Sequence, residues 1–318
     1  MPDPETASSR ASRATSGSPI ESNWESLFPY PSQVVDLSGV GYAYVDVGQG
    51  SSPMVCVHGN PTWSFYWRRI LAHFSPTRRV LAVDHVGCGR SDKPQRYPYR
   101  LATHRDNLLS WIERLDLRNI TLVVHDWGGA IGLAAAVQQP ERFARLVITN
   151  TGAFPPPYLP WRIAACRLPF FGTLALRGLN AFARAATTMA IARQSHLPTT
   201  VAAGLLAPYD SWNNRVAIDQ FVKDIPRRPS HPTYRVLADI ERQLPRLSHL
   251  PILLIWGMRD WCFRPECLSR FEKIWPQATV IRLPDVGHYV MEDAPEEVCQ
   301  AIERFFAAPP PASEPSAS

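Results

Sequence analysis

A charged carboxylate stands at the sharpest corner that the sequence predicts. Residues 119–132 read NITLVVHDWGGAIG: an apolar run typical of a buried strand ends at Asp126, and a glycine-bearing run opens a helix after Trp127. A carboxylate can attack an electrophilic sp³ carbon and form a covalent ester, which makes Asp126 a candidate nucleophile. Its structural alternative is an N-cap that accepts hydrogen bonds from the first turn of the helix.

Two more candidates follow other predicted strands. Asp260 ends the stretch PILLIWGMRD, and His288 lies in LPDVGHYVMED after the last strand. Taken singly, Asp260 is an ordinary loop cap with Asp285 as a competitor, and His288 is an ordinary loop histidine. Placed together after three different strands, in the order nucleophile, acid, histidine, the three residues predict a catalytic group. Asp126 needs no base to attack, so His288, oriented by Asp260, acts later on a proton, as on the water that hydrolyses the ester.

An anion that leaves the substrate needs hydrogen-bond donors. Trp127 carries an indole N–H, and Asn60, in VHGNPTWSFYWRR, carries an amide with two donor hydrogens. Asn60 follows a His-Gly turn after a strand, where a backbone N–H would also face Asp126, as in an oxyanion hole. Ordinary roles stay open for both residues: core packing for Trp127, and turn geometry before Pro61 for Asn60.

The cysteines and the remaining histidines indicate structure rather than a metal site. Cys262 and Cys267 are not followed by a second Cys or His pair at ligand spacing, so no metal and no cofactor are expected. Six cysteines without a paired framework indicate free thiols in a reducing compartment, and we expect a cytoplasmic protein. His58 and His125 flank the candidate residues and are interpreted as side chains that hold strand-end loops.

The elements that must position these residues alternate along the chain. From residue 32 onward, strand and helix signals follow each other, which predicts an α/β fold. SQVVDL and YAYVDV are expected to form an opening hairpin, followed by the strands PMVCV, RRVLAV, NITLVVHD, RLVITNT, PILLIWG and ATVIRLP. Helices are predicted over about residues 63–74, 103–115, 127–139 and 296–306.

The alternation stops between residues 153 and 234, where a Pro-rich start is followed by helical patterns without a convincing strand. Both ends of this insertion lie on one sheet, so it must fold back as a helical cap over a pocket at the carboxyl ends of the strands. The predicted organisation is a tail over residues 1–24, a core over 25–152 and 235–307, a cap over 153–234 and a tail over 308–318. Both tails are rich in Ser, Ala and Pro, and we expect them to be disordered.

Composition excludes several classes of protein. The net charge of +5 comes from arginines spread along the 318 residues, so no nucleic-acid site is predicted. No apolar run approaches the roughly 18 residues that a membrane span needs, so no transmembrane segment is expected. Residues 162–192 are unusual because they mix apolar side chains with Arg162, Arg167, Arg177 and Arg184. Such a face suits acyl chains, a partner protein or a membrane surface.

With these residues identified, the chain resembles the haloalkane dehalogenases. It is most similar to the branch that subfamily III dehalogenases share with the OleB-type β-lactone decarboxylases of bacterial long-chain olefin biosynthesis. The resemblance covers about residues 30 to 306, cap included, and implies an α/β-hydrolase fold with a mostly parallel eight-stranded sheet. It also implies Asp126 as nucleophile, His288 as base, Asp260 as acid, and Asn60 with Trp127 as the anion-stabilising pair. The matching stretches are HGNPTWSFYWR, DHVGCGRSDKP, VVHDWGGAIG, LVITNTGAF, RGLNAFARAA, LAPYDSWNNRVAIDQFVKDIP and VGHYVMEDAPE.

The resemblance also bears on the position of the acid. Some dehalogenases place a Glu after the strand that here ends in ITNTG, where this chain has Asn150 and Thr151. The acid is then expected at Asp260, as in the decarboxylase branch. Related fluoroacetate dehalogenases and epoxide hydrolases usually have other residues where Asn60 and Trp127 stand, which disfavours both of those activities.

Two activities fit the predicted site equally well. Haloalkane dehalogenation and the conversion of a cis-3,4-dialkyl β-lactone into a cis-alkene and carbon dioxide both use a carboxylate nucleophile and an anion-binding pair. A small apolar substrate is expected in either case, and the apolar cap favours long alkyl chains. The alternatives are an epoxide hydrolase, which needs paired acidic donors such as Tyr158, Tyr209 or Tyr234, and a catalytically idle ligand-binding protein. The resemblance adds one expected partner, a β-lactone synthetase of the same pathway.

Overall fold

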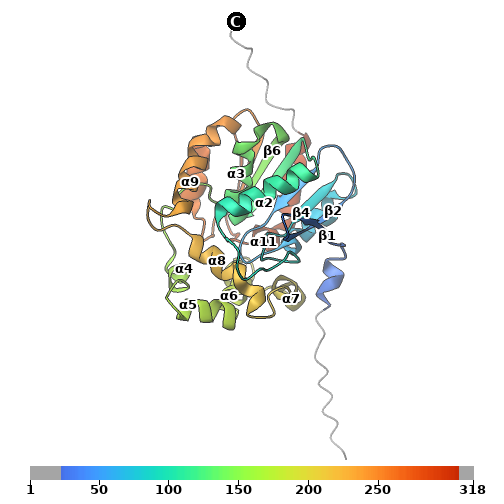
Figure 1. Cartoon of the computed structure of the whole chain (residues 1–318). Helices are drawn as coiled ribbons and strands as arrows, with labels where there is room; N and C mark the ends of the chain where they lie inside the picture. Colours follow the sequence, from blue (N-terminus) through green and yellow to red (C-terminus); the bar gives the residue numbers. More distant parts are fainter. Residues whose placement is uncertain (1–22, 308–318) are drawn as a thin grey trace, which may run out of the picture.

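The computed structural model describes residues 23–307 (Figure 1). The predicted tails over residues 1–24 and 308–318 lie outside the described residues, except for Asn23 and Trp24. Trp24 begins a short 3-10 helix, η1 (Trp24–Leu27), and its indole lies 5.8 Å from the ring of Trp63 in an edge-to-face contact. Trp24 therefore packs against the core, although it lies inside the stretch that the sequence predicts as a tail.

Eight strands form one sheet in the order β1-β2-β4-β3-β5-β6-β7-β8. The first strand pairs antiparallel with the second, the second pairs antiparallel with the fourth, and all other neighbours are parallel. The predicted fold class, a mostly parallel eight-stranded sheet, is confirmed. The strands are β1 (Gln33–Asp36), β2 (Gly41–Val47), β3 (Met54–Val57), β4 (Val80–Val83), β5 (Ile120–Asp126), β6 (Phe143–Thr151), β7 (Ile252–Gly257) and β8 (Thr279–Leu283).

The central strands form because they are apolar on both faces. Every residue of β3, β4, β5 and β7 is buried, as expected for parallel strands that are covered by helices on two sides. Successive side chains alternate between the two cores: Leu122 and Val124 belong to one, and Val123 belongs to the other. The sheet therefore separates two hydrophobic layers.

Helices cover both faces of the sheet. The core that contains Leu122 also holds side chains of α2 (Leu101–Arg114), α3 (Trp127–Gln138), α9 (Pro232–Gln243) and α10 (Pro265–Ile274). The opposite core holds side chains of η2 (Ser64–Trp67), α1 (Arg68–Phe74), α11 (Val290–Asp293) and α12 (Pro295–Ala307). The four predicted helices are present, with the first one divided between η2 and α1.

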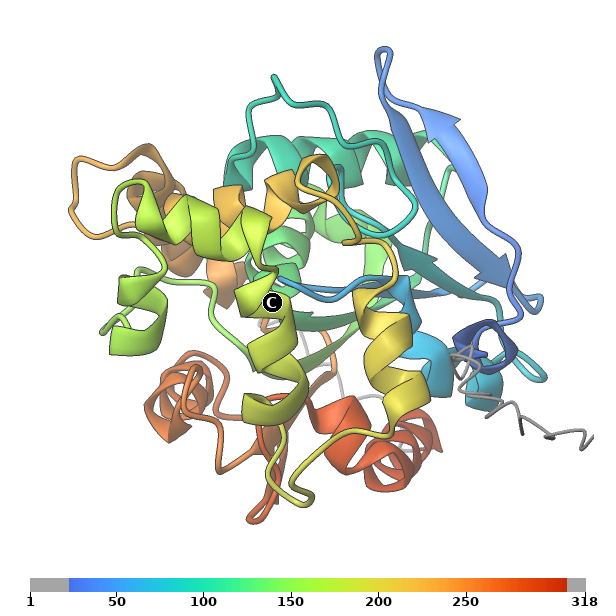
Figure 2. The ribbon, with the colours of Figure 1, turned by 90° about the horizontal axis from the view of Figure 1, so that it is seen from below.

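The insertion after β6 consists of short helices, and among its described residues there is no strand. Figure 2 shows these helices lying across one edge of the sheet. The predicted end of the cap at residue 234 falls inside α9, which packs on the sheet beside α2 and α3. None of the helices in residues 23–307 has the length and apolar character that crossing a membrane requires. The elements of the cap are α4 (Trp161–Ala165), α5 (Phe171–Thr173), η4 (Leu174–Gly178), α6 (Ala181–Met189), α7 (Thr199–Leu206), η5 (Asn213–Arg215) and α8 (Val216–Asp224).

Candidate active site

Asp126 occupies a strained turn between β5 and α3. Its φ of 53° and ψ of −131° are unfavourable for a side chain with a Cβ atom, and they lift the carboxylate above the end of the sheet. Two neighbouring glycines leave the necessary room. A Cβ on Gly59 would lie 2.0 Å from Asp126 Oδ1, and one on Gly128 would lie 2.1 Å from the carbonyl oxygen of Val57. The backbone around Asp126 is therefore built for this turn.

The Asp126 carboxylate is buried between backbone donors and a histidine. The backbone N–H of Asn60 donates to Oδ1 at 2.6 Å, and Oδ2 lies 3.6 Å from Nε2 of His288. Burial raises the pKa of Asp126, while His288 and the backbone N–H groups of Asn60 and Trp127 act in the opposite direction. The N–H groups and the imidazole therefore stabilise the ionised carboxylate in an apolar surrounding.

His288 is oriented by Asp260. Nδ1 of the ring donates to Asp260 Oδ2 at 2.8 Å, so in the neutral ring Nε2 presents a lone pair toward Asp126. Burial disfavours a charged imidazole, but Asp260 and Asp126 outweigh it and raise the pKa of His288. Burial likewise disfavours the ionised Asp260, and the contact with His288 outweighs it and lowers that pKa. The two residues form a coupled pair with the histidine facing the nucleophile position.

Asn150 holds Asp260 in place, a role that sequence reasoning missed. Its side-chain N–H donates to Asp260 Oδ2 at 2.9 Å, and its Oδ1 accepts the backbone N–H of Gly257 at 2.8 Å. Cys262 completes the arrangement, because its backbone N–H donates to Asp260 Oδ1 at 2.6 Å. The sequence drew attention to Asn150 only as a position without a carboxylate. The useful signal was its place at the end of β6, the strand between β5 and β7.

His125 and His58 hold strand-end loops, as predicted. Nε2 of His125 lies 2.9 Å from the carbonyl oxygen of His288, which ties the histidine loop to β5. His58 Nε2 accepts the backbone N–H of His85 at 3.1 Å, and its Nδ1 contacts the carbonyl oxygen of Gly59 at 2.7 Å. Both rings are completely buried, and burial lowers the pKa of each.

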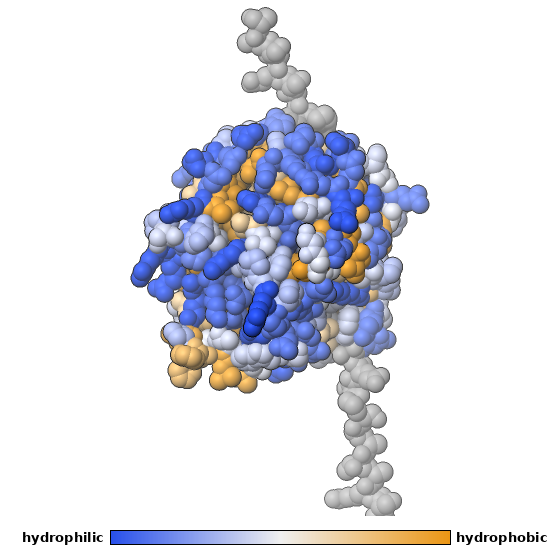
Figure 3. Space-filling view, in the orientation of Figure 1, coloured by the Kyte–Doolittle hydropathy of each residue, from blue (hydrophilic) through white to orange (hydrophobic). Residues whose placement is uncertain are grey.

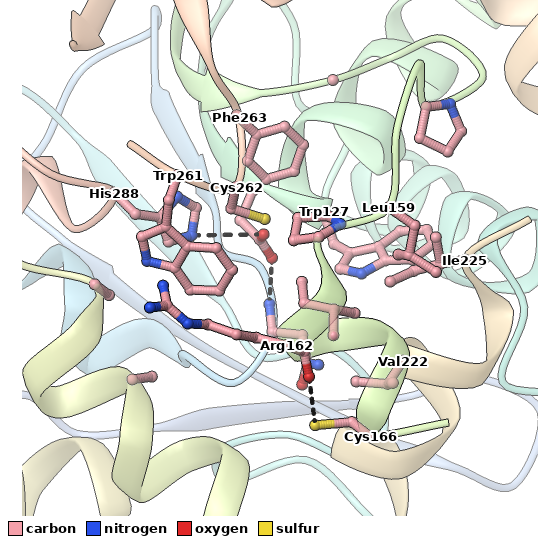
Figure 4. A pocket seen from close by; sticks show the side chains of 18 of the residues that line it. Trp127, Leu159, Arg162, Cys166, Val222, Ile225, Trp261, Cys262, Phe263 and His288 are labelled. Carbon is pink, nitrogen blue, oxygen red and sulfur yellow. Dashed lines mark hydrogen bonds and ion pairs between the residues drawn. The ribbon is translucent and has the colours of Figure 1, made fainter. Parts of the chain in front are cut away.

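The two predicted donors meet Asp126 in different ways. Asn60 approaches through its backbone N–H, and its side-chain amide donates weakly to the carbonyl oxygen of Ile218 at 3.4 Å. The Trp127 indole packs against Phe221 with ring centroids 5.4 Å apart. Among the described residues, no hydrogen-bond acceptor is found for its N–H. Trp127 lies on one side of the cavity and His288 on the other (Figure 4).

Asp126 and His288 lie at the floor of a cavity of about 320 Å³ between the sheet and the cap. Asn60 and Trp127 line it from the core side. The remaining wall is mostly apolar, with Leu159, Ile163, Phe182, Met189, Val222 and Ile225 contributed by the cap. A cavity of this character accepts apolar groups and excludes water from the carboxylate.

The structure does not bring together the side chains that epoxide hydrolysis or a metal site would need among the described residues. Of the three tyrosines considered as epoxide donors, only Tyr158 lines the cavity, and its hydroxyl donates to the carbonyl oxygen of Cys262. The Tyr209 hydroxyl donates to the carbonyl oxygen of Thr62 at 3.1 Å. Within residues 23–307, no group of three or more His, Cys, Asp or Glu side chains is placed to hold a metal ion.

Comparison with known proteins identifies similar chains. A sequence model of the α/β hydrolase fold matches residues 52–295. The chain is 40% identical to a cis-3-alkyl-4-alkyloxetan-2-one decarboxylase of Shewanella oneidensis, over 89% of this chain and 90% of the relative. It is 32% identical to haloalkane dehalogenase 2 of Mycobacterium bovis, over 88% of this chain and 96% of the relative. A solved structure of a mutant haloalkane dehalogenase, DatA from Agrobacterium tumefaciens C58, has a TM-score of 0.80 at 25% identity and covers 89% of this chain and 99% of that one.

The similarity includes the cap as well as the sheet, because each alignment covers most of both chains. It therefore extends well beyond the corner around Asp126, and it agrees with the resemblance expected from the sequence. Both groups of relatives carry the names of enzymes. The chain is an enzyme of the α/β-hydrolase family and belongs with the haloalkane dehalogenases and the cis-3-alkyl-4-alkyloxetan-2-one decarboxylases.

Proposed function

We propose that the protein decarboxylates cis-3,4-dialkyl oxetan-2-ones through a covalent ester on Asp126. The observation that carries this proposal is a buried carboxylate at the floor of an apolar cavity, with His288 Nε2 3.6 Å away and already paired with Asp260. The sequence identity favours the lactone over the halide, because the decarboxylase relative is 40% identical and the dehalogenase relative 32%.

The reaction needs two bond changes at neighbouring carbons. An oxygen of Asp126 attacks the ring carbon that bears the ester oxygen, and the C–O bond of the strained ring breaks to leave a carboxylate on the adjacent carbon. The bond to that carboxylate then breaks, carbon dioxide departs, and its electron pair forms the C=C bond as Asp126 is released. Inversion in the first step followed by anti elimination gives a cis-alkene from a cis-lactone. Water and a net proton transfer are not required.

Trp127 and Asn60 serve the carboxylate that forms on ring opening. The indole N–H of Trp127 borders the cavity and has no acceptor among the described residues, so it is free to donate to a new anion. The Asn60 amide also borders the cavity and makes only a 3.4 Å contact with the carbonyl oxygen of Ile218. Donors that are already in place when charge develops stabilise it without reorganisation.

Haloalkane dehalogenation is the second candidate. It is supported by the lone pair that the Asp260 contact leaves on His288 Nε2, next to Asp126. In this reaction Asp126 displaces the halide, Trp127 and Asn60 hold it, and His288 takes a proton from the water that attacks the ester carbonyl. The product is an alcohol, and the carboxylate is regenerated.

The test compares both substrate classes on one preparation of enzyme. A cis-dialkyl β-lactone and a set of bromo- and iodoalkanes are supplied in parallel, with alkene and free halide measured. Fast alkene release that disappears in Asp126→Asn supports decarboxylation. Halide release with an untouched lactone assigns the protein to the dehalogenases, and failure with every electrophile favours an idle ligand-binding protein. Asp239→Asn, on the exposed face of α9, is the matched control.

The same proposal extends to the cap, the cellular compartment and a partner enzyme. The cap over residues 153–234 is proposed as a separate structural unit that closes the substrate site. All six cysteines are free, which suits a cytoplasmic protein. The lactone must come from a ring-closing enzyme, and a β-lactone synthetase is the proposed partner. Purification from the native cell with and without crosslinking tests this partner, and repeated absence of such an enzyme counts against it.

A further inference from the structure

The cap exposes an unusual number of large apolar side chains. Of the nine such residues that are exposed within residues 23–307, seven belong to the cap. Phe170, Phe171 and Trp161 are 89%, 77% and 75% exposed. We call six of them the cap patch, and in Figure 3 orange atoms gather at the place that α4 and α5 occupy in Figure 1. The cap patch consists of Trp161, Leu168, Phe170, Phe171, Leu174 and Leu179.

One member of the cap patch is held in a strained backbone conformation. Phe170 has a φ of 59° and a ψ of −55°, although an aromatic residue strongly avoids positive φ. Its ring gains little from packing in return, because it is the most exposed large apolar side chain among the described residues. Strain at a residue that packs against nothing indicates a function for its outward position.

The positive charge of the protein is concentrated in the same segment. Residues 153–234 contain nine Lys and Arg against three Asp and Glu, whereas the whole chain has a net charge of +5. Between Glu141 and Asp210 the sequence has no acidic residue at all. The cap patch therefore lies in a basic stretch of the sequence. Of the three acidic residues of the segment, Asp219 is the one beside the patch, where it pairs with Lys223 and accepts a hydrogen bond from Thr173.

A basic hollow adjoins the cap patch. Arg167, which precedes Leu168 of the patch, borders a hollow of about 290 Å³ with Arg227, Arg228, Ser230 and His231. The nearest acidic residue in sequence, Asp224, is buried and already accepts hydrogen bonds from Arg100, the backbone of Leu101 and Thr233. Arg167 already donates through Nη1 to the carbonyl oxygens of Val222 and Ile225, so Arg227 and Arg228 carry the guanidinium groups that can meet an anion such as a phosphodiester.

Part of the lining of the active-site cavity reaches the surface beside the cap patch. Among the cavity-lining residues, Pro157, Arg162 and Ala181 are exposed. Arg162 directly follows Trp161 of the patch, and Ala181 lies two residues after Leu179 of the patch. The cap segment α4 contributes Ile163 to the cavity wall and Trp161 to the surface. In Figure 4 the Arg162 side chain lies beside Trp261 at the edge of the cavity. The helix α4 therefore takes part in both the patch and the cavity wall.

We propose that the cap patch docks the enzyme on an anionic lipid surface. The apolar side chains enter the interface between headgroups and acyl chains, and Arg227 and Arg228 bind lipid phosphates. An anionic bilayer suits the patch because its surface combines an apolar acyl-chain region with negatively charged headgroups. The helices of the patch are short, so they would lie at this surface and not cross the bilayer. The docking itself follows from the patch and its charge. One further step, the passage of dialkyl lactone from the lipid into the cavity, rests on the proposed function.

The test is vesicle flotation with the full chain. Vesicles of phosphatidylcholine alone are compared with vesicles that contain phosphatidylglycerol, at low and high salt. We expect binding to the anionic vesicles that high salt weakens, because the attraction between exposed charges is screened. Phe170→Gly with Phe171→Ser should lower the partition constant about tenfold or more by removing two inserted rings. Arg227→Gln with Arg228→Gln should lower it on anionic vesicles only.

Matched variants separate docking from misfolding and from other partners. Glycine accepts the φ of residue 170, so thermal melting should show an intact fold. Val34→Ser removes an exposed apolar side chain on β1, and Arg242→Gln with Arg246→Gln removes two exposed charges from the core surface, so both should bind like the parent. Turnover of a short, water-soluble substrate should be unchanged in every variant, and it reports on the proposed function independently.

Two outcomes overturn the proposal. The first is the absence of binding to either kind of vesicle, or equal binding by the parent and the Phe170→Gly, Phe171→Ser variant. The second is self-association of the parent protein in gel filtration that the double variant abolishes, without any vesicle binding. That result assigns the cap patch to a second copy of the chain.

Discussion

Asp126 and His288 have different roles in the two proposed reactions. Asp126 must form and lose a bond to carbon in both reactions. His288 must remove a proton from water only when the ester is hydrolysed, as in dehalogenation. The contact between His288 Nδ1 and Asp260 at 2.8 Å fixes the tautomer that such a step needs. One substitution at this residue therefore distinguishes the two mechanisms.

His288→Gln should stop haloalkane turnover after one event and affect alkene release from a β-lactone much less. Without a base, the alkyl ester on Asp126 persists, whereas elimination of carbon dioxide needs no water. Intact mass spectrometry after exposure to an iodoalkane should show one added alkyl group that is absent from Asp126→Asn. Equal loss of both activities, with no adduct from either substrate, would show that His288 acts before ester formation.

Asn150 provides a second test at the residue scale. Asn150→Ala removes the N–H that contacts Asp260 Oδ2 at 2.9 Å, so the orientation of His288 becomes less fixed. We expect hydrolysis of the haloalkane-derived ester to slow by about tenfold, as is usual for a group that orients a catalytic side chain. Ester formation should be unchanged, which rapid quenching can separate from hydrolysis. Asn107→Ala is the control, because Asn107 lies on α2 and donates to the hydroxyl of Tyr97. Slower ester formation in Asn150→Ala would contradict a positioning role for Asn150.

The sequence could predict side chains at strand ends but not the atoms they use. Asp126, Asp260 and His288 could be predicted because each follows a separate apolar strand, and the carboxyl ends of parallel strands lie at one edge of the sheet. For Asn60 both a side-chain amide and a backbone N–H were expected at the site; the backbone N–H makes the contact with Asp126, and the amide makes a 3.4 Å contact with the carbonyl oxygen of Ile218. The contact of Asn150 with Asp260 joins residues 110 positions apart, and a single sequence contains no signal for such a pairing.

At the scale of elements, the core was more predictable than the cap. The central strands β3, β4, β5 and β7 are buried on both faces, so their limits are marked by the change to polar loops. The cap consists of segments such as α5 with three residues and α4 with five, too short for a 3.6-residue period to appear. The predicted end of the cap at residue 234 lies inside α9, which begins at Pro232.

Trp63 attaches the cap to the core by completing a helix of the cap. The carbonyl oxygen of Gly204 in α7 would normally accept the N–H of residue 208, but Pro208 has none. The indole N–H of Trp63 donates to that oxygen instead, at 2.9 Å. Trp63→Phe should therefore lower the free energy of unfolding by about 1–3 kcal/mol more than the loss of ring volume alone.

Trp111→Phe supplies the matched control for that measurement. Trp111 is also fully buried, but its indole N–H has no partner among the described residues. Its substitution removes a similar volume without removing a hydrogen bond. Urea titrations of both variants, compared with the parent, give the difference. Equal destabilisation would mean that the contact between Trp63 and Gly204 contributes nothing measurable.

At the scale of the whole molecule, four histidines are buried in the core without charge. His58, His85, His104 and His125 are almost completely inaccessible. Burial lowers the pKa of His85 to about 4 and lowers the pKa of the other three well below the ordinary value. His288 is the one buried histidine near them whose pKa is raised. The folded protein therefore binds fewer protons than the unfolded chain in mildly acidic solution.

The consequence is a loss of stability between about pH 6.5 and pH 4, before most carboxylates titrate. Histidines with lowered pKa stabilise the fold fully above 6.5, and this contribution is lost as the pH falls and the unfolded chain takes up protons. His288 acts in the opposite sense, as do Asp84 and Asp126, whose raised pKa favours proton uptake by the folded protein, but the four histidines outnumber these three groups. His104→Leu should reduce the difference in unfolding free energy between pH 8 and pH 5 by about 2 kcal/mol, because one proton-linked group is removed. His196→Gln, at an exposed histidine of the cap, is the control variant. Urea titrations at both pH values measure it, and an identical pH dependence in His104→Leu and the parent would show that His104 is protonated in the folded state.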